Sequence, residues 1–283
     1  MALRALAVCG AISRETGLTC AGRTDGGGAQ VLATMTVMAY CRNIGIKYYH
    51  TPVQTIEHAT VATGPQEWES LFSLGTGESR ACECGLPIVT LRKFLRRPLL
   101  WRRPCVIQVK HFTGYMNTLP DPFSSIAEEI RSKYRGAARN VAQNASVAVH
   151  IRRGDVSHSG NSGRYTSNEA VARTVACAME HLRRHGRGLD CAIYSQGQES
   201  DFRIFRDLGC KLRLNEEPTD TIQSLISADV LIQAKSAFSY LAGLLNKGIV
   251  IFEPFVTKGR KDWKPIDACG NVYLNGVSLN MSN

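Results

Sequence analysis

The sequence lacks several features that would assign a function at once. No apolar run approaches the ~18 to 20 residues of a membrane-spanning helix. There is no C-x2-C pair for a zinc ribbon, no H-E-x-x-H and no G-x-S-x-G. There is also no D-x-D pair of the kind that carries a divalent metal on a nucleotide-sugar pyrophosphate. His181 and His185 have a metal-like spacing but no acidic company, so we expect a solvated surface there and no metal site.

Aromatic residues are scarce, whereas positive charge is in excess. Phe, Trp and Tyr make up 7% of the chain and are not interleaved with the basic residues, which argues against nucleic-acid binding. Lys and Arg number 34 against 24 Asp and Glu, giving a net charge of +10. This excess favours an anionic partner, such as nucleic acid, a membrane surface or a phosphorylated small molecule, although it also suits a merely soluble basic surface.

The length and composition are those of an ordinary globular protein. The 283 residues, 44% hydrophobic and 20% charged, fit one large or two ordinary domains. Ten cysteines are too few and too scattered for a disulfide scaffold, and we expect most of them to be buried. That usage favours a soluble protein of the reducing cytoplasm. The apolar stretch 5–12 after Arg4 leaves a targeting segment, and so the secretory pathway or an organelle, open.

Strand and helix signals alternate along the chain, which predicts an α/β fold with parallel sheets. The predicted boundary lies in the polar stretch 136–144, between an N-terminal lobe at 1–140 and a C-terminal lobe at 141–283. The expected strands are 18–21, 46–50, 105–110, 146–152, 189–194, 211–214, 230–233 and 249–252. The expected helices are 29–43, 125–134, 170–185, 199–208, 220–227 and 236–245, with 75–104 irregular. We place a capping box at Thr166 and Glu169.

The sharpest local signal is the segment His150-Ile-Arg-Arg-Gly-Asp155 at the end of a predicted strand. Ligands of open α/β sheets bind beyond the carboxyl ends of the strands. Arginine offers a planar fork that grips phosphate oxygens. We expect Arg152 and Arg153 to alternate faces along the strand, one meeting a ligand and the other pairing with Asp155 or a neighbour. An exposed strand end with surface arginines is the simple alternative.

Two further segments could receive an anion. Asp25-Gly-Gly-Gly-Ala-Gln30 opens a helix, where glycines let backbone N–H groups approach a phosphate. A simple turn explains this loop equally well. In Ala228–Ser239 a strand runs into a helix that begins with Ser236 and Ser239. These serines either cap the helix or contribute to a phosphate site.

Taken together, these motifs resemble the α1,2-/α1,6-/peptide-O-fucosyltransferase superfamily. The resemblance covers Thr16 to Phe255 and is most specific at His150 to Asp155, with a good match at Ser236-Ala-Phe-Ser239. It implies a GT-B-like α/β fold, in which two Rossmann-like lobes with parallel sheets face a central cleft. It also implies an inverting, metal-independent transfer of fucose from GDP-fucose, or a related nucleotide sugar, to a glycan or glycoprotein hydroxyl. No cofactor, nucleic acid or integral membrane span is implied.

The resemblance also implies roles for individual residues. Arg152 would be the catalytic residue that holds the β-phosphate of the donor. The other donor-binding residues would be His150, Arg153, Asp155, Gly27, Gly28, Asp220, Ser236 and Ser239. The glycine loop would belong to the N-terminal, acceptor-side lobe, and the C-terminal lobe would bind the nucleotide sugar. The basic segment 91–103 is also expected on the acceptor side.

The sequence departs from the family at several positions. Ser195-Gln196 stands where the α1,6 branch has paired acids, and Ala237 where one relative has a second serine. No catalytic base is evident, with Asp155, His158 and Glu199 as candidates. Two alternatives therefore stay open: an inactive nucleotide- or glycan-binding protein of the same fold, and another transferase with an anionic donor, such as a sulfotransferase.

Overall fold

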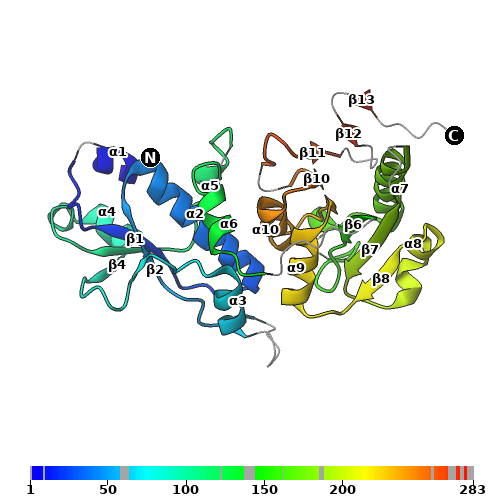
Figure 1. The fold of residues 1–283 in the computed structure, drawn as a ribbon. Coiled ribbons are helices and arrows are strands. Elements are labelled where there is room, and N and C mark those ends of the chain that lie inside the picture. The colour runs from blue at the N-terminus through cyan, green and yellow to red at the C-terminus, as the bar shows by residue number, and fades with distance from the viewer. Residues whose placement is uncertain are drawn as a thin grey trace. The chain divides into compact units, whose positions relative to one another are not determined.

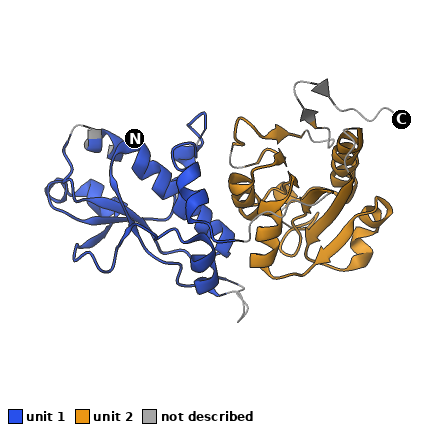
Figure 2. Cartoon of the chain, viewed as in Figure 1, with its two compact units in different colours: residues 1–136 blue, residues 137–283 orange. Residues whose placement is uncertain are grey.

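The structure is a computed structural model in which the chain forms two compact units, residues 1–136 and 137–283 (Figure 2). Each unit is described by itself. The described residues are 2–8, 10–57, 64–121, 123–136, 144–160, 162–184, 188–255, 258–266, 272–274 and 277–278. No helix in this part of the chain is long and apolar enough to cross a bilayer.

The N-terminal unit contains a parallel five-stranded sheet with the order β3-β2-β1-β5-β4 (Figure 1). Its strands are β1 (Gly17–Cys20), β2 (Lys47–His50), β3 (Ser79–Arg80), β4 (Ile88–Thr90) and β5 (Val106–Val109). Its helices are α1 (Ala2–Val8), α2 (Gly27–Ile44), α3 (Pro65–Phe72), α4 (Leu91–Arg96), α5 (Thr113–Met116), α6 (Ala127–Lys133) and the 3-10 turn η1 (Pro98–Leu100).

Local sequence accounts for the central elements of this unit. All four residues of β1 are buried, as expected for an inner parallel strand. Helix α2 ends at Gly45, whose φ of 70° places it in the left-handed region and lets its N–H reach the carbonyl of Cys41. The segment 75–104, predicted to be irregular, instead contains β3, β4 and α4. That prediction is wrong because strands of two or three residues are too short to show a period.

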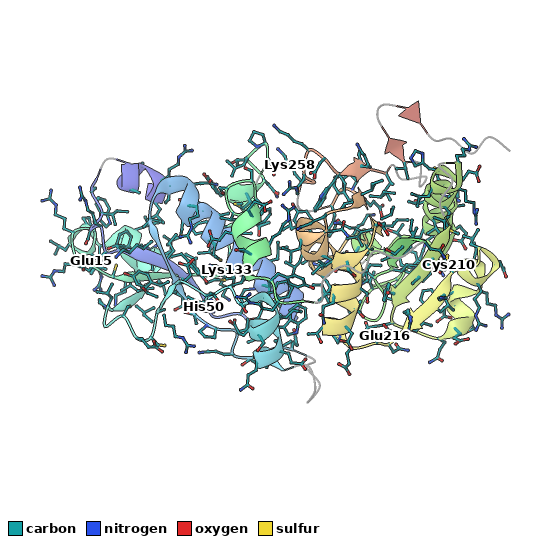
Figure 3. The ribbon with its side chains drawn as sticks, in the orientation of Figure 1. Glu15, His50, Lys133, Cys210, Glu216 and Lys258 are labelled. Atoms are coloured by element: carbon teal, nitrogen blue, oxygen red, sulfur yellow. The ribbon has the colours of Figure 1, made fainter. Side chains whose placement is uncertain are left out.

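A partly buried ion-pair network ties α6 to the rest of this unit. The Lys133 ammonium group, labelled in Figure 3, lies 3.0 Å from Glu78 and 2.9 Å from Glu129. Arg42 of α2 contacts the same two carboxylates, at 2.6 and 2.9 Å. Lys133 and Arg42 together keep Glu129 ionised and lower its pKa to about 2 against the effect of burial. The network accounts for a lysine side chain that is only 10% exposed.

The C-terminal unit contains a parallel six-stranded sheet with the order β11-β10-β9-β6-β7-β8. Its strands are β6 (Ala145–His150), β7 (Leu189–Ser195), β8 (Lys211–Leu214), β9 (Val230–Ile232), β10 (Ile249–Phe252) and β11 (Lys264–Pro265). Its helices are α7 (Asn168–Arg184), α8 (Arg203–Asp207), α9 (Pro218–Ser227) and α10 (Ala237–Leu245), with the 3-10 turns η2 (Ser162–Arg164) and η3 (Glu199–Phe202). A separate two-stranded sheet comprises β12 (Tyr273–Leu274) and β13 (Val277–Ser278).

This strand order is that of a doubly wound, Rossmann-like sheet. The chain runs outward from β6 through β7 to β8, then returns to place β9 on the other side of β6 and continues to β10. The prediction of an α/β protein with two Rossmann-like, parallel-sheet lobes is therefore confirmed. The cleft predicted between the lobes, and the acceptor and donor roles assigned to them, stay predictions.

The core of the C-terminal unit lies between its sheet and the helices. Val149 of β6 and Ile193 of β7 are fully buried, and they pack in one cluster with Val175 of α7 and Phe205 of α8. Cys191 and Cys210 lie in the same cluster, and their Sγ atoms are 2.7 Å apart (Cys210 is labelled in Figure 3). Six of the eight described cysteines are buried, as predicted, whereas Cys82 is exposed.

Two local predictions near the end of β6 are wrong. Strand β6 ends at His150, so Arg152 and Arg153 follow the strand instead of alternating along it. Thr166 does not cap α7: the Ser167 hydroxyl oxygen accepts from the N–H of Ala170 at 3.2 Å. The Thr166 hydroxyl donates instead to the carboxylate of Glu253, a partner that is distant in sequence. His185 lies outside the described residues.

Candidate functional site

The candidate site lies where the strand order of the C-terminal sheet reverses. The crevice beyond the carboxyl ends of the strands at such a switch point is the usual ligand site of an open α/β sheet. Here the reversal falls between β6 and β9. A pocket is found at this place, lined by residues that follow β6, β9 and β10 and by residues at the start of α7. Its lining includes His150, Arg152, Arg153, Arg164, Thr166, Gln233 and Glu253.

Arg152, in the turn that follows β6, lines this pocket. Its Nη2 donates to Oδ1 of Asp155 at 2.7 Å, and this bond is the main reason that the pKa of Asp155 lies below its usual range. Its Nε is buried and has no hydrogen-bond partner among the described residues. Because a buried guanidinium N–H is costly to leave unpaired, Arg152 is prepared to bind an anionic group.

Gly154 makes the Arg152–Asp155 pairing possible. Its φ of +81° lies in the left-handed region, which other L-residues rarely adopt. A Cβ at this position would also lie 2.3 Å from Oε1 of Gln196. The turn therefore requires glycine for its backbone conformation, and a larger residue would also displace the side-chain amide of Gln196.

Arg153 differs from Arg152 because its donors are already used within the protein. It donates to the carbonyl oxygens of Arg152 and Thr166, at 2.8 and 3.0 Å, and to Oδ1 of Asn168 at 2.5 Å. Its guanidinium lies 4.6 Å from the ring centroid of Tyr165. Burial lowers its pKa below the usual value. Arg153 thus fixes the segment around Thr166 to the end of β6.

His150 is the last residue of β6 and lies under the pocket. It is buried, its ring centroid lies 5.3 Å from that of Phe238, and its Nδ1 has no partner among the described residues. Burial, with a smaller contribution from the charge of Arg152, lowers the pKa of His150 to about 3. Its imidazole is therefore neutral at physiological pH and cannot supply a second positive charge.

Sequence reasoning missed a polar cluster that joins three loops of the pocket. Glu253, directly after β10, accepts from Nζ of Lys235 at 2.8 Å and from the Thr166 hydroxyl at 2.6 Å. The side chains of Lys235 and Glu253 are only 18% and 13% exposed. An acidic residue immediately after the apolar run Ile249–Phe252 was the available signal. Glu253 holds the loops after β9 and β10 against the segment before α7.

The serine hydroxyls after β9 are engaged within the protein. Ser236 is the N-cap of α10, and its oxygen accepts from the N–H of Phe238 at 3.2 Å. Ser239 is fully buried, and its hydroxyl donates to the carbonyl oxygen of Ala234 at 3.0 Å. Of the two roles expected for these serines, helix capping or phosphate binding, Ser236 therefore has the capping role. Neither serine is among the residues that line the pocket.

The other predicted residues lie outside the described pocket. Asp220 is exposed in the first turn of α9. Glu199, a candidate base, is paired with Arg206 at 2.9 Å on the surface. His158, another candidate base, is exposed, with its ring 5.8 Å from that of Tyr165. None of these three lines the pocket.

The glycine-rich loop belongs to the N-terminal unit. Gly27 and Gly28 are the first residues of α2, and Gly26 before them provides no side-chain cap. A Cβ on Gly27 would lie 2.3 Å from the indole of Trp68, so close packing requires this glycine. The Gln30 amide donates to the carbonyl oxygens of Asp25 and Thr55, at 2.6 and 2.7 Å, and closes the loop. Gly27 and Gly28 are themselves buried, so the phosphate-binding role expected of this loop stays a prediction.

Among the described residues, no group of three or more His, Cys, Asp and Glu side chains is placed to hold a metal ion. The three arginines of the pocket outnumber its single carboxylate, that of Glu253. The lining therefore favours an anionic ligand.

Comparison with known proteins gives structural neighbours only, since no protein-family model and no curated protein matches the sequence. NodZ α-1,6-fucosyltransferase, solved after soaking with GDP-fucose, has a TM-score of 0.43 and 12% identity, covering 82% of this chain and 93% of its own. The E. coli heptosyltransferase WaaC with ADP has a TM-score of 0.43 and 11% identity, covering 90% and 94%. POFUT1 in complex with GDP has a TM-score of 0.40 and 10% identity, covering 85% and 99%. These similar structures are glycosyltransferases.

Proposed function

We propose that this chain is a glycosyltransferase that transfers fucose from GDP-fucose to a hydroxyl of a glycan or a protein. The transfer would invert the anomeric carbon and would need no metal. The observation that carries the proposal is the position of Arg152 at the switch point of a Rossmann-like sheet, where its Nε is buried and has no partner among the described residues. In doubly wound parallel sheets, nucleotide phosphates bind beyond the carboxyl ends of the strands at the switch point.

Arg152 would act on the leaving group. When the glycosidic bond of a nucleotide sugar breaks, negative charge develops on the β-phosphate. A preorganised donor stabilises that charge more strongly in the transition state than in the bound substrate, and so it raises the rate. Asp155 would hold the guanidinium in place from the other side of the Gly154 turn, leaving Nε directed at the phosphate.

The remaining residues would shape the donor site. His150, neutral because it is buried, would offer a ring nitrogen to the nucleotide without adding charge. Arg153 and the Lys235–Glu253 pair would position the loops. We retain Gly27, Gly28, Asp220 and Ser236 as proposed donor contacts. Ser239 is fully buried and its hydroxyl donates to the carbonyl oxygen of Ala234, so its proposed contribution is to support the start of α10 from beneath the donor site.

The proposal is tested by a thermal-shift panel with GDP, UDP, ADP and adenosine 3′,5′-bisphosphate, each with and without EDTA. A ligand at ~100 times its dissociation constant adds roughly 2.7 kcal/mol to the free energy of unfolding, and this raises Tm measurably. We expect GDP alone to raise Tm, equally with EDTA, and Arg152→Ala to remove the shift. Arg203→Ala is the matched control, because Arg203 is an exposed arginine that does not line the pocket.

Other outcomes separate the alternatives. A shift with adenosine 3′,5′-bisphosphate would favour a sulfotransferase-like activity. A shift with GDP but no hydrolysis or transfer of fucose from GDP-fucose, over a wide set of acceptors, would favour a binding protein of the same fold. A shift that EDTA abolishes would refute metal independence.

A further inference from the structure

A strongly basic segment of the N-terminal unit lies outside the residues assigned to the proposed donor site. It consists of six exposed side chains after the edge strand β4, which we call the basic face: Arg92, Lys93, Arg96, Arg97, Arg102 and Arg103. The sequence has no Asp or Glu between Glu83 and Asp121. The basic face therefore concentrates positive charge without local compensation.

The segment that carries the basic face is held firmly against the unit. Phe94, in the middle of α4, is fully buried. The Trp101 indole N–H donates to the carbonyl oxygen of Phe94 at 3.1 Å, and the carbonyl oxygen of Trp101 accepts from the N–H of Ser13 at 2.9 Å. Thr90 caps α4 by accepting from the N–H of Lys93. The charges are thus presented from an ordered surface.

Two large apolar side chains are exposed in and just before the same stretch of chain. Leu99, in η1 between Arg97 and Arg102, is 86% exposed, and Ile88 of β4 is 50% exposed. They are two of the four large hydrophobic side chains that the described residues expose. An exposed leucine flanked by cations is suited to a lipid bilayer: the leucine can insert among the acyl chains while the cations contact anionic headgroups.

The six cations also have no ion-pair partner in the part of the chain that the structure describes. None of them forms an ion pair with any described residue, although Glu15, labelled in Figure 3, lies in the adjoining segment. Thr90, Arg92, Lys93, Arg96 and Arg97 line a common groove. By contrast, three of the four exposed cations around α8 and β8 are paired with acids: Arg206 with Glu199, Lys211 with Asp190, and Arg213 with Glu216.

We propose that the basic face docks on a membrane surface that carries anionic phospholipid headgroups. Charge complementarity supports this occupant, and the exposed leucine favours a membrane over nucleic acid. Proteins that bind single-stranded nucleic acid stack bases on exposed aromatic side chains. The aromatic residues here are Phe94, which is buried, and Trp101, which is partly buried and donates to Phe94. This inference is independent of the proposed enzymatic function.

The expected effect follows from the charge count. A lysine or arginine close to an anionic bilayer is worth roughly fivefold in affinity, and the attraction decays within a Debye length. Binding should therefore weaken steeply as salt rises from ~0.1 M to ~1 M, because the Debye length shortens from ~10 Å to ~3 Å.

The test is co-sedimentation of the full chain with vesicles of phosphatidylcholine and phosphatidylglycerol in a two-to-one ratio, with pure phosphatidylcholine vesicles as reference. The variant R92Q/K93Q/R96Q/R97Q should bind the mixed vesicles at least ~10-fold more weakly. Leu99→Ser should weaken binding and make the remainder more sensitive to salt. The matched control R203Q/R206Q/K211Q/R213Q removes the same charge from α8 and β8, and it should bind like the wild type.

Four outcomes would overturn the proposal. Absence of binding to mixed vesicles would do so, as would equal binding to pure phosphatidylcholine. An equal loss of vesicle binding in the two quadruple variants would show that binding depends only on the net charge of the protein. Tight binding of a single-stranded oligonucleotide that competes with the vesicles would reassign the surface to nucleic acid. Thermal unfolding of each variant, with and without GDP, confirms its folding and tests the donor site separately.

Discussion

Arg152 and Asp155 face each other across a one-glycine turn, with Nη2 of the arginine 2.7 Å from Oδ1 of the aspartate. Arg152 lines the pocket, and its Nε is buried without a hydrogen-bond partner in the described part of the chain. A guanidinium that is anchored at one end and unsatisfied at the other is suited to bind a phosphate in one orientation. The proposed chemistry depends on this relationship.

Arg152→Lys should lower the rate of GDP-fucose turnover by ~100- to 1000-fold, which is the usual effect of removing one oriented donor. Lysine retains the charge but lacks the planar fork, so it cannot donate both to Asp155 and to the phosphate in the same geometry. Release of GDP from GDP-fucose measures the effect. A lysine variant with wild-type turnover would show that charge alone suffices.

Gly154→Ala should lower the free energy of unfolding by about 1–3 kcal/mol, because φ at this position is positive. Part of the loss reflects the contact of the new Cβ with Gln196, so Gln196→Ala should recover that part and leave the backbone part. Urea denaturation measures both. Gly163→Ala, at a glycine with open space and no positive φ, should change stability by less than ~0.5 kcal/mol. A Gly154 variant as stable as this control would refute the strained turn.

The titration of His150 should make the free energy of unfolding depend on pH in the acidic range. Its pKa is about 3 in the folded protein, against ~6.5 in the unfolded chain, so only the unfolded state binds this proton between those values. The free energy of unfolding therefore falls as the pH drops through the window from about 6.5 to about 3, by up to ~1.4 kcal/mol per pH unit, and is unaffected by His150 above it.

His150→Gln removes this titration, so the wild type and the variant should differ in the slope of stability against pH only within that window. Urea denaturation at a series of pH values gives the two slopes. Parallel curves from neutral to acid pH would mean that His150 is not held neutral.

Glu253→Gln should destabilise the C-terminal unit by about 1–3 kcal/mol, because it leaves the Lys235 ammonium with little exposure and no anionic partner. The double variant K235M/E253Q removes both charges and should recover most of the loss. Urea denaturation of the two single variants and the double variant closes the thermodynamic cycle. A cycle without coupling would show that the two groups act independently.

Strand and helix periods predicted the C-terminal sheet well, because its strands are apolar and its connections are regular. Strand β8 and strand β10 have the predicted bounds. The periods could not reveal β3 or β4, which are two and three residues long and depend on partners distant in sequence.

The candidate site was only partly predictable for the same reason. The motif from His150 to Asp155 indicated its location. The capping role expected of Thr166 belongs to Ser167, because the Thr166 hydroxyl has a stronger partner in Glu253. A contact between residues 87 positions apart leaves no local pattern.

The most direct test of the central claim is isothermal titration calorimetry of GDP and GMP with the wild type and with Arg152→Ala. These nucleotides differ only in the β-phosphate that Arg152 is proposed to hold. We expect the wild type to bind GDP much more tightly than GMP, and the variant to bind both with the affinity that the wild type has for GMP. A variant that keeps the preference for GDP, or that loses both nucleotides equally, would contradict the account.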